Sequence, residues 1–415
     1  MRTNNIYILF LSVMLAVPFT GLRAQTDTMY PPRQNLTFGA YLNRVGKQNL
    51  EYLASQLNVS IAEAELAAAR VLPDPLFNFE GNKETYKLGL SCSLELGKRC
   101  ARVKLMRSQS ELEKLALEQG FQVLRAQATE LYLDAILQRE LLKVKESSYR
   151  YMVSLSRSDS LRCVLGEIAE NDARQSRVEA MNLLNEVYDQ ESAYHSSLVG
   201  LNRFMGMAAD TLSVPLENWG NQERDFALAS LLELGKANRI DLLVASKNVD
   251  VNSQAYKLTC AGRRPDIGLS LSYEREWKSL LPQARYATVG VSVPLLFSTI
   301  NKGAVKSAKY RIDQAVVMQK NVELQIQAEI THAWFVFEAE RKKVAQYRSG
   351  VLEESLKVLD SVIYKYRHGE TSILDVLMAQ RAYNEIRQNY LKTINGYVVA
   401  LVALEKSCGV WDICF

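Results

Sequence analysis

The sequence of 415 residues predicts a mainly α-helical protein with a small β part, in which long coiled-coil helical hairpins carry four transmembrane β-strands per chain. Three observations predict this class. The chain is an internal duplication, each copy contains long amphipathic stretches without proline, and each copy contains two short segments in which apolar and small or polar residues alternate. No linker rich in proline, glycine or serine divides the chain, so we expect one elongated architecture.

Residues 1–24 have the pattern of a secretory signal peptide. Arg2 precedes an apolar run over residues 6–19, and Ala24 is a small residue ahead of Gln25. The run is shorter than the roughly 20 residues that span a bilayer as a helix, so we expect cleavage after Ala24 rather than a membrane anchor. The mature protein, residues 25–415, therefore leaves the cytoplasm. It contains no later stretch apolar enough for a transmembrane helix, which leaves β-strands for membrane residence.

The two copies cover residues from about 35 to 210 and from about 225 to 410. Pro73 recurs as Pro265, an offset of 265 − 73 = 192, Gly89 recurs as Gly290, an offset of 290 − 89 = 201, and Gly166 recurs as Gly369, an offset of 369 − 166 = 203. The second copy has therefore gained residues between its two alternating segments, where an insertion is expected to form a loop.

Four alternating segments predict the strands. They cover residues 77–80 and 88–94 in the first copy and residues 267–273 and 286–293 in the second. Bulky apolar residues occupy one side of each segment, and small or polar residues occupy the other. This pattern fits strands with lipid on one face and a hydrated lumen on the other.

Four strands cannot close a membrane barrel, because the smallest such barrels have about eight. An open edge in lipid would leave backbone groups without hydrogen bonds, so the chain is expected to associate with copies of itself. Three copies would supply twelve strands.

The long arms are predicted from a helical repeat of apolar residues. They run from residue 98 to about 151 and from 167 to about 205, and then from 302 to 364 and from 372 to 406. Such long amphipathic stretches without capping signals are typical of coiled-coil packing. A helix of ~60 residues is ~90 Å long, enough to cross a compartment. The long helices alone would also fit a periplasmic coiled-coil adaptor or scaffold protein, but such a protein would have no apolar strands.

Composition excludes several other classes. The 50 basic and 46 acidic residues are interspersed, which does not suit nucleic-acid binding. The three histidines are far apart, and none of the six cysteines has zinc-like spacing, so we expect no metal site and no cofactor. Only Cys408 and Cys414 are close enough in sequence to suggest a disulfide. No nucleophile with a base and no phosphate loop occurs, so we expect no enzyme activity.

The most specific stretch covers residues 366–381, which read YRHGETSILDVLMAQR. It resembles the turn and the start of the last long helix in the outer-membrane efflux protein family, the TolC-like proteins. Residues 93–99, which read SLELGKR, and residues 293–297, which read VPLLF, resemble the strand-to-helix junctions of its heavy-metal efflux subgroup. The resemblance covers nearly the whole mature chain.

The resemblance implies a homotrimeric TolC-like α/β-barrel, with twelve strands in outer-membrane lipid and the helices in the periplasm of a Gram-negative bacterium. It also implies docking with a periplasmic adaptor, or membrane fusion protein, and with an inner-membrane pump of the RND type or another exporter. The protein would then be the duct through which a pumped substrate leaves the cell. Metal ions, drugs, detergents and polypeptides all stay open as its cargo.

Ducts of this family close at the periplasmic tips of their helices, where acidic residues and tyrosines make rings and contacts between helices. By position relative to the turn glycines Gly166 and Gly369, the matching gate residues are Asp172, Asp375 and Tyr366. The alternative for each aspartate is stabilisation of the first helical turn. Thr371 and Met378 depart from the prototype, which has an arginine and a second aspartate there, so we expect a different set of gate contacts.

Overall fold

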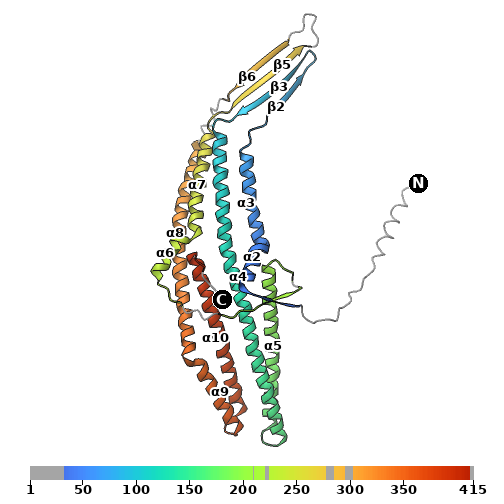
Figure 1. Ribbon diagram of the computed structural model, residues 1–415, viewed down its shortest axis with the longest axis vertical. Helices are drawn as coiled ribbons and strands as arrows, with labels where there is room; N and C mark the ends of the chain where they lie inside the picture. Colours follow the sequence, from blue (N-terminus) through green and yellow to red (C-terminus); the bar gives the residue numbers. More distant parts are fainter. Residues whose placement is uncertain (1–31, 209, 220–223, 277–284, 295–301, 412–415) are drawn as a thin grey trace, which may run out of the picture.

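The computed structural model describes residues 32–208, 210–219, 224–276, 285–294 and 302–411. They form an elongated molecule with a β-sheet at one end (Figure 1). At the other end the helical hairpins α4–α5 and α9–α10 reverse direction, and short helices lie near the middle (Figure 1). Within those ranges, no helix combines the length and apolar character needed to cross a membrane. The predicted signal peptide, residues 1–24, lies outside the described residues.

The sheet confirms the four predicted strands. It is antiparallel throughout, in the order β2-β3-β5-β6, so the two copies pair through β3 and β5. The register places Phe77 opposite Leu90, Leu90 opposite Leu271 and Leu271 opposite Val289. Bulky apolar residues thus form a row across one face. The strand bounds are β2 (Leu76–Gly81), β3 (Thr85–Leu94), β5 (Ile267–Glu276) and β6 (Arg285–Ser292).

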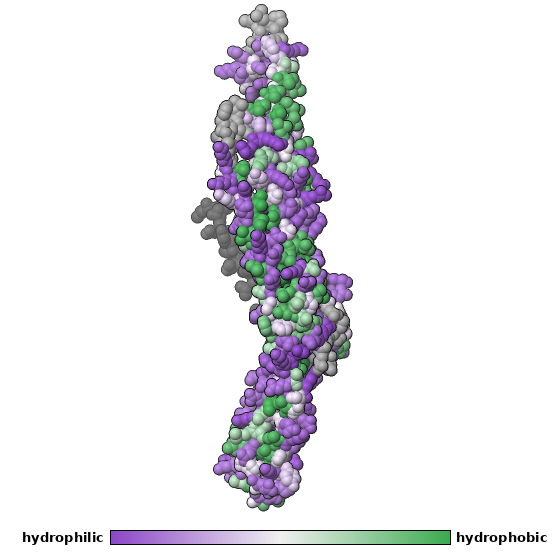
Figure 2. All heavy atoms as spheres, turned by 90° about the vertical axis from the view of Figure 1, so that its left-hand side faces the viewer, coloured by the Kyte–Doolittle hydropathy of each residue, from purple (hydrophilic) through white to green (hydrophobic). Residues whose placement is uncertain are grey.

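The opposite face of the sheet consists largely of small and polar residues. A Cβ atom on Gly268 would lie 2.3 Å from the Ser292 Oγ, and one on Gly290 would lie 2.5 Å from the Ser270 Oγ. Adjacent strands therefore fit closely on this face, which a larger side chain at either glycine would disturb. Figure 2 shows a hydrophobic patch over the sheet end of the molecule, next to hydrophilic residues near the tip.

The long helices lie side by side and form two halves of a wall (Figure 1). In the half next to the sheet, α4 packs between α3 and α7, and α7 packs between α4 and α8. In the other half, α4 packs between α5 and α10, and α10 packs on α9. The bounds are α3 (Leu50–Ala69), α4 (Lys98–Val164), α5 (Glu170–Phe204), α7 (Ile240–Ala261), α8 (Lys302–Gln346), α9 (Leu352–Arg367) and α10 (Ile373–Cys408).

One helix begins where another ends in each copy, which reflects the duplication. In the first copy, the Asn49 side chain caps the start of α3 and also donates a 2.9 Å hydrogen bond to the Phe204 carbonyl at the end of α5. Gly206 follows that end with φ 72°. A Cβ at Gly206 would lie only 2.3 Å from the Gln48 carbonyl oxygen.

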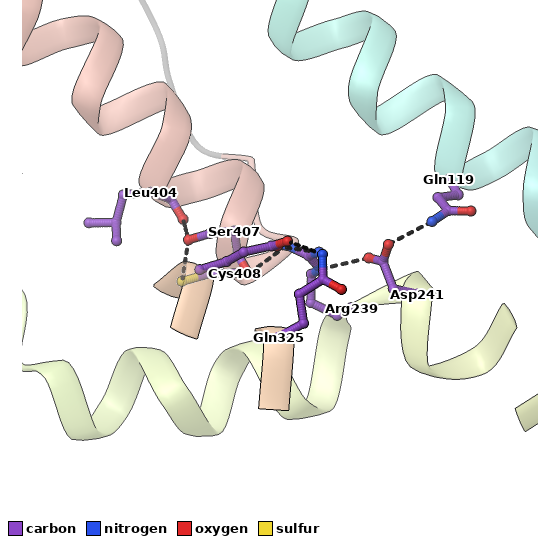
Figure 3. Close-up of polar contacts among 8 residues, drawn as sticks. Gln119, Arg239, Asp241, Gln325, Leu404, Ser407 and Cys408 are labelled. Carbon is purple, nitrogen blue, oxygen red and sulfur yellow. Dashed lines mark hydrogen bonds and ion pairs between the residues drawn. The ribbon is translucent and has the colours of Figure 1, made fainter. Parts of the chain in front are cut away.

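The second copy builds the equivalent joint with an arginine (Figure 3). Arg239, just before α7, donates to the Ser407 carbonyl at 3.2 Å near the end of α10. The same guanidinium pairs with Asp241 at 2.7 Å and with Glu329 of α8 at 2.8 Å. A cation near a helix C-terminus also stabilises the helix dipole. Arg239 therefore ties three helices together.

We expect Gly206→Ala to destabilise the first joint. A left-handed backbone costs an L residue ~1–2 kcal/mol, and the new Cβ would also collide with the Gln48 carbonyl. Gly200→Ala is the matched control, because Gly200 is helical and a Cβ added there would have no atom within 4 Å. The thermal unfolding midpoint should fall for Gly206→Ala alone, and equal midpoints would contradict the role of the joint.

The second long arm is broken, which corrects the prediction of one helix over residues 302–364. α8 ends at Gln346, a π-helical turn follows over Tyr347–Val351, and α9 starts at Leu352. Gly350 lies inside this turn with φ 117°, a value at which an α-helix cannot continue. The first arm is longer than predicted, since α4 continues without a break to Val164 rather than to about residue 151.

A middle belt of short elements was not predicted from the sequence. β1 (Arg33–Leu36) pairs parallel with β4 (Leu212–Pro215), beside α2 (Phe38–Gln48), and α6 (Leu228–Asn238) lies against α8 and α10. Tyr132 of α4 is fully buried under this belt and donates to the Leu36 carbonyl at 3.0 Å. Arg139 of α4 donates to the Pro215 carbonyl of β4 at 2.6 Å, so α4 also holds the segment that follows the first copy.

The expected disulfide concerns one residue that the structure does not describe. Cys408 is buried and free, and its thiol lies 3.8 Å from the Leu231 carbonyl oxygen. Cys414 lies outside the described residues.

Candidate functional site at the hairpin tips

The two long hairpins turn at Gly166 and Gly369. Both glycines have positive φ, 76° and 75°, which is the conformation that ends many helices. In each turn the next residue donates back across the helix end, from Glu167 to the Arg162 carbonyl at 2.8 Å and from Glu370 to the Lys365 carbonyl at 2.9 Å. The copies therefore reverse direction by the same hydrogen-bond pattern.

Asp375 is the third residue of α10, and Ser372 is the N-cap residue of this helix. Its carboxylate accepts hydrogen bonds from the Ser372 amide at 3.1 Å, from the Ser372 hydroxyl at 2.7 Å and from the Thr371 hydroxyl. The Ser372 hydroxyl in turn accepts from the Asp375 amide, which completes a capping box. The bond from Thr371, and then those from Ser372, lower the pKa of Asp375. Asp375 therefore has a local role in the helix, and its part in a pore ring stays a prediction.

Asp172 lies in the first turn of α5 and is half-buried. Its negative charge is close enough to Asp159 and Tyr366 to favour their neutral forms. The two predicted aspartates thus differ in surroundings, since Asp375 is exposed at its helix cap. Met378, one of the departures from the prototype, is 62% exposed.

Tyr366 is buried, and its hydroxyl donates to the Asp159 carboxylate of α4 at 2.9 Å. Asp159 is itself fully buried, and the Arg162 guanidinium lies over the Tyr366 ring at 5.3 Å from its centre. Burial raises the pKa of Asp159, while hydrogen bonds from Tyr366 and Ser176 act in the opposite direction. The hydrogen bond from Tyr366 to Asp159 joins the two hairpins near their tips.

Asp159 was not predicted from the sequence. It lies seven residues before Gly166, on the helix that enters the turn, whereas the predicted aspartates follow the turn glycines. The duplication offers no signal either, because the equivalent position, 159 + 203 = 362, is Val362. Only the packing of α4 against α9 and α10 brings it to Tyr366, which is 207 residues away.

Two further contacts between the hairpins lie closer to the middle belt. Arg381 of α10 makes a two-point ion pair with Glu179 of α5, at 2.9 and 2.6 Å, and Glu179 is buried. The buried Ser148 hydroxyl of α4 donates to Asn384 of α10 at 2.7 Å. Such charge-assisted and buried contacts fix the relative position of two helices more strongly than surface ion pairs.

These residues form contacts between helices rather than a reaction centre. Within the described ranges, no group of three or more His, Cys, Asp or Glu side chains could hold a metal ion. The tip instead contains contacts that fasten the two hairpins together, namely the hydrogen bond of Tyr366 with the buried Asp159 and the ion pair of Arg381 with Glu179.

Comparison with known proteins finds a matching family model. It is described as outer membrane efflux protein and matches residues 231–410, within the second copy. The outer membrane efflux protein BepC of Brucella suis biovar 1 (strain 1330) is 25% identical over 295 residues. That alignment covers 68% of this chain and 62% of BepC, so the chain spans less than two thirds of that relative.

Solved structures share the fold at low sequence identity. The CmeC outer membrane channel of Campylobacter jejuni has a TM-score of 0.74 at 14% identity, over 89% of this chain and 85% of CmeC. The open state of the MtrE outer membrane channel of Neisseria gonorrhoeae has a TM-score of 0.71 at 16% identity, over 89% and 88%. CusC, whose structures concern folding and transmembrane channel formation, has a TM-score of 0.73 at 17% identity, over 90% and 92%.

Proposed function

We propose that this chain is the outer-membrane duct of a multi-part efflux system, which its similarity to the outer membrane efflux protein family over residues 231–410 and to BepC supports. Its place is the outer membrane of a Gram-negative bacterium, with the helical arms in the periplasm. The duct provides an aqueous path, and the energy for transport comes from a pump in the inner membrane. Its action is physical, since it conducts a substrate without changing it.

The sheet is the observation that supports this proposal most directly. One face is apolar, with Val289 at 77% and Phe77 at 69% exposure, and the other is small and polar. A single chain gains nothing by exposing such a face to water, because buried apolar surface is worth ~25 cal/mol per Å². Lipid on the apolar side and a hydrated lumen on the other would suit both faces.

Assembly into a trimer is supported by the two edges of the wall. α3 and α8 are the outer helices of the half next to the sheet, and each carries an exposed apolar stripe along its free side. The stripe on α8 repeats every seven residues and the one on α3 has steps of seven and four residues, both of which keep the side chains on one face of the helix. Their members are Leu50, Leu57 and Ile61 on α3 and Tyr310, Val317 and Leu324 on α8.

Charge favours contact between α3 of one copy and α8 of the next. α3 contains three acidic residues and no lysine or arginine, a net charge of −3. Residues 302–324 of α8 contain five basic and two acidic residues, so their net charge is 5 − 2 = +3. In the same ring, edge strand β6 would meet β2 of the next copy, and three copies would close twelve strands.

The gate of the duct is proposed at the hairpin tips. Tyr366 and Asp159 would hold the two hairpins of one chain together, and Asp172 would add its charge beside them. Asp375 would contribute to a ring around the pore from its exposed position at the start of α10. Ion conductance would rise when these fastenings open.

The proposed partners are a periplasmic adaptor protein and an inner-membrane pump, which would meet the duct at the same tips. Heavy-metal cations are a proposed cargo, on the resemblance of residues 93–99 and 293–297 to that subgroup. Specificity in such a system would rest mainly with the pump, because the duct has to pass whatever the pump delivers.

The proposal is tested by the mass of the mature protein extracted from membranes in mild detergent, measured by light scattering corrected for detergent. Three chains per particle, and dependence on detergent, are expected. A monomer that stays in solution without detergent would instead support a periplasmic coiled-coil scaffold.

A further inference from the structure

The break in the second long arm lies at a glycine that has free space beside it. Gly350 has φ 117° inside the Tyr347–Val351 turn, yet no atom lies within 4 Å of the position that a Cβ would occupy. The glycine is therefore required by the backbone conformation and not by close packing. L residues avoid this part of conformational space, so the turn depends on residue 350 being glycine.

The first copy has no such break, although its arm is matched in length. The turn glycines set the offset between copies at 203, so the position equivalent to Gly350 is 350 − 203 = 147. Ser147 lies within the unbroken helix α4 and accepts a hydrogen bond from Arg387 at 3.2 Å. The break is thus a property of the second hairpin alone.

The break separates a fixed helix from a loosely packed one. Above it, α8 contributes to the main core through buried residues such as Ile330 and Phe337. Below it, a cavity of about 550 Å³ lies between the start of α9 and helices α4 and α10. Leu352 and Leu356 line it from α9, opposite Val144 of α4 and Tyr383 of α10. The upper part of α9 therefore has space on the side that faces the first hairpin.

A glycine with positive φ stands at each end of α9, Gly350 above and Gly369 below. The 16 residues of α9 form a straight rod about 24 Å long. Near its lower end, Leu359 and Ile363 pack with Met152 of α4, and Tyr366 donates to Asp159. These lower contacts hold α9 to the first hairpin.

We propose that the Tyr347–Val351 turn is a hinge, about which α9 moves between a position fastened to α4 through Tyr366 and Asp159 and a released one. The described arrangement is the fastened one. Movement about Gly350 lets α9 change its tilt while α8 keeps its place in the wall. The inference rests on the proposed duct function, in which release of α9 widens the pore at the tips.

Gly350→Ala tests the hinge in the full-length trimer reconstituted in planar lipid bilayers. Alanine disfavours the bent turn, so the ratio of open to closed time is expected to rise about ten-fold relative to wild type. Hydrogen exchange of the amides of residues 347–354 should slow at the same time, as the turn gains regular helical hydrogen bonds.

Gly120→Ala is the matched control. Gly120 also lies in a long helix, α4, and a Cβ added there would meet no atom within 4 Å, but its backbone is helical. It should leave the open-to-closed ratio unchanged. If Gly350→Ala slows exchange in the turn yet gates like Gly120→Ala, the hinge is overturned while the duct stands. If wild type and both variants form no channels at all, the duct proposal fails and with it the hinge.

Discussion

Val289→Arg is expected to abolish assembly of the protein in the outer membrane. Val289 lies in the middle of β6 on the apolar face, next to Leu271, and is 77% exposed in the single chain. An arginine facing lipid near the middle of the bilayer costs ~2–4 kcal/mol, and a trimer contains three of them. The amount of trimer recovered from outer membranes, measured on gels without heating, should fall to a small fraction of the wild-type amount.

Thr288→Arg is the control for that variant, because it makes a similar change at the adjacent residue. Thr288 lies opposite Ser272 on the small, polar face of the sheet. An arginine there would meet a hydrated lumen rather than lipid, so the trimer should assemble. Equal losses from both variants would contradict the assignment of the two faces.

The closed fraction of the duct is expected to increase as the pH falls, through protonation of Asp159. Burial raises the pKa of this carboxyl, so the fastened tip favours its neutral form. For a carboxyl with a raised pKa, this stabilisation is complete at low pH and is lost as the pH rises through that pKa. Between the ordinary pKa of aspartate and the raised pKa of Asp159, the free energy that favours the closed tip changes by up to about 1.4 kcal/mol per pH unit.

Asp159→Asn shows whether the pH dependence comes from Asp159 itself, because it removes this carboxyl and leaves the charged neighbours Asp172 and Arg162 in place. The neutral amide still offers an oxygen to the Tyr366 hydroxyl, so the variant should be as closed at pH 7 as the wild type is at low pH. Its single-channel open fraction should no longer change with pH. Asp375→Asn should keep the wild-type profile, because its helix-cap hydrogen bonds lower the pKa of Asp375 out of that range. A pH dependence that survives in Asp159→Asn would rule Asp159 out as its source.

Much of the fold follows from patterns that are local in the chain. Alternation over residues 267–273 specifies a strand with two different faces, and the structure has that strand as β5 with the predicted apolar row. The offset of 203 between Gly166 and Gly369 predicts two hairpins of equal reach, and both glycines occupy the turns with positive φ. These features need no knowledge of which segment packs on which.

The site was only partly predictable, because its contacts join residues that are far apart in the chain. Tyr366 was placed at the tip from its distance to Gly369, but its burial against Asp159 depends on how the second hairpin packs on α4. The ion pair of Arg381 with Glu179 joins α10 to α5 in the same way. A carboxylate or an arginine on a helix has the same local sequence signature whether it faces water or a partner.

By itself, the sequence determined which segments are helices and which are strands, from the repeat of their apolar residues. It also determined where the chain reverses and that it is duplicated, since each of these features depends on neighbouring residues or on self-similarity. The tertiary structure decided which helices meet, that Asp159 is buried, and that Gly350 breaks the second arm while α4 stays whole. The physical reason is that one glycine costs a helix only ~1 kcal/mol. Whether the helix bends there is therefore settled by the packing on either side.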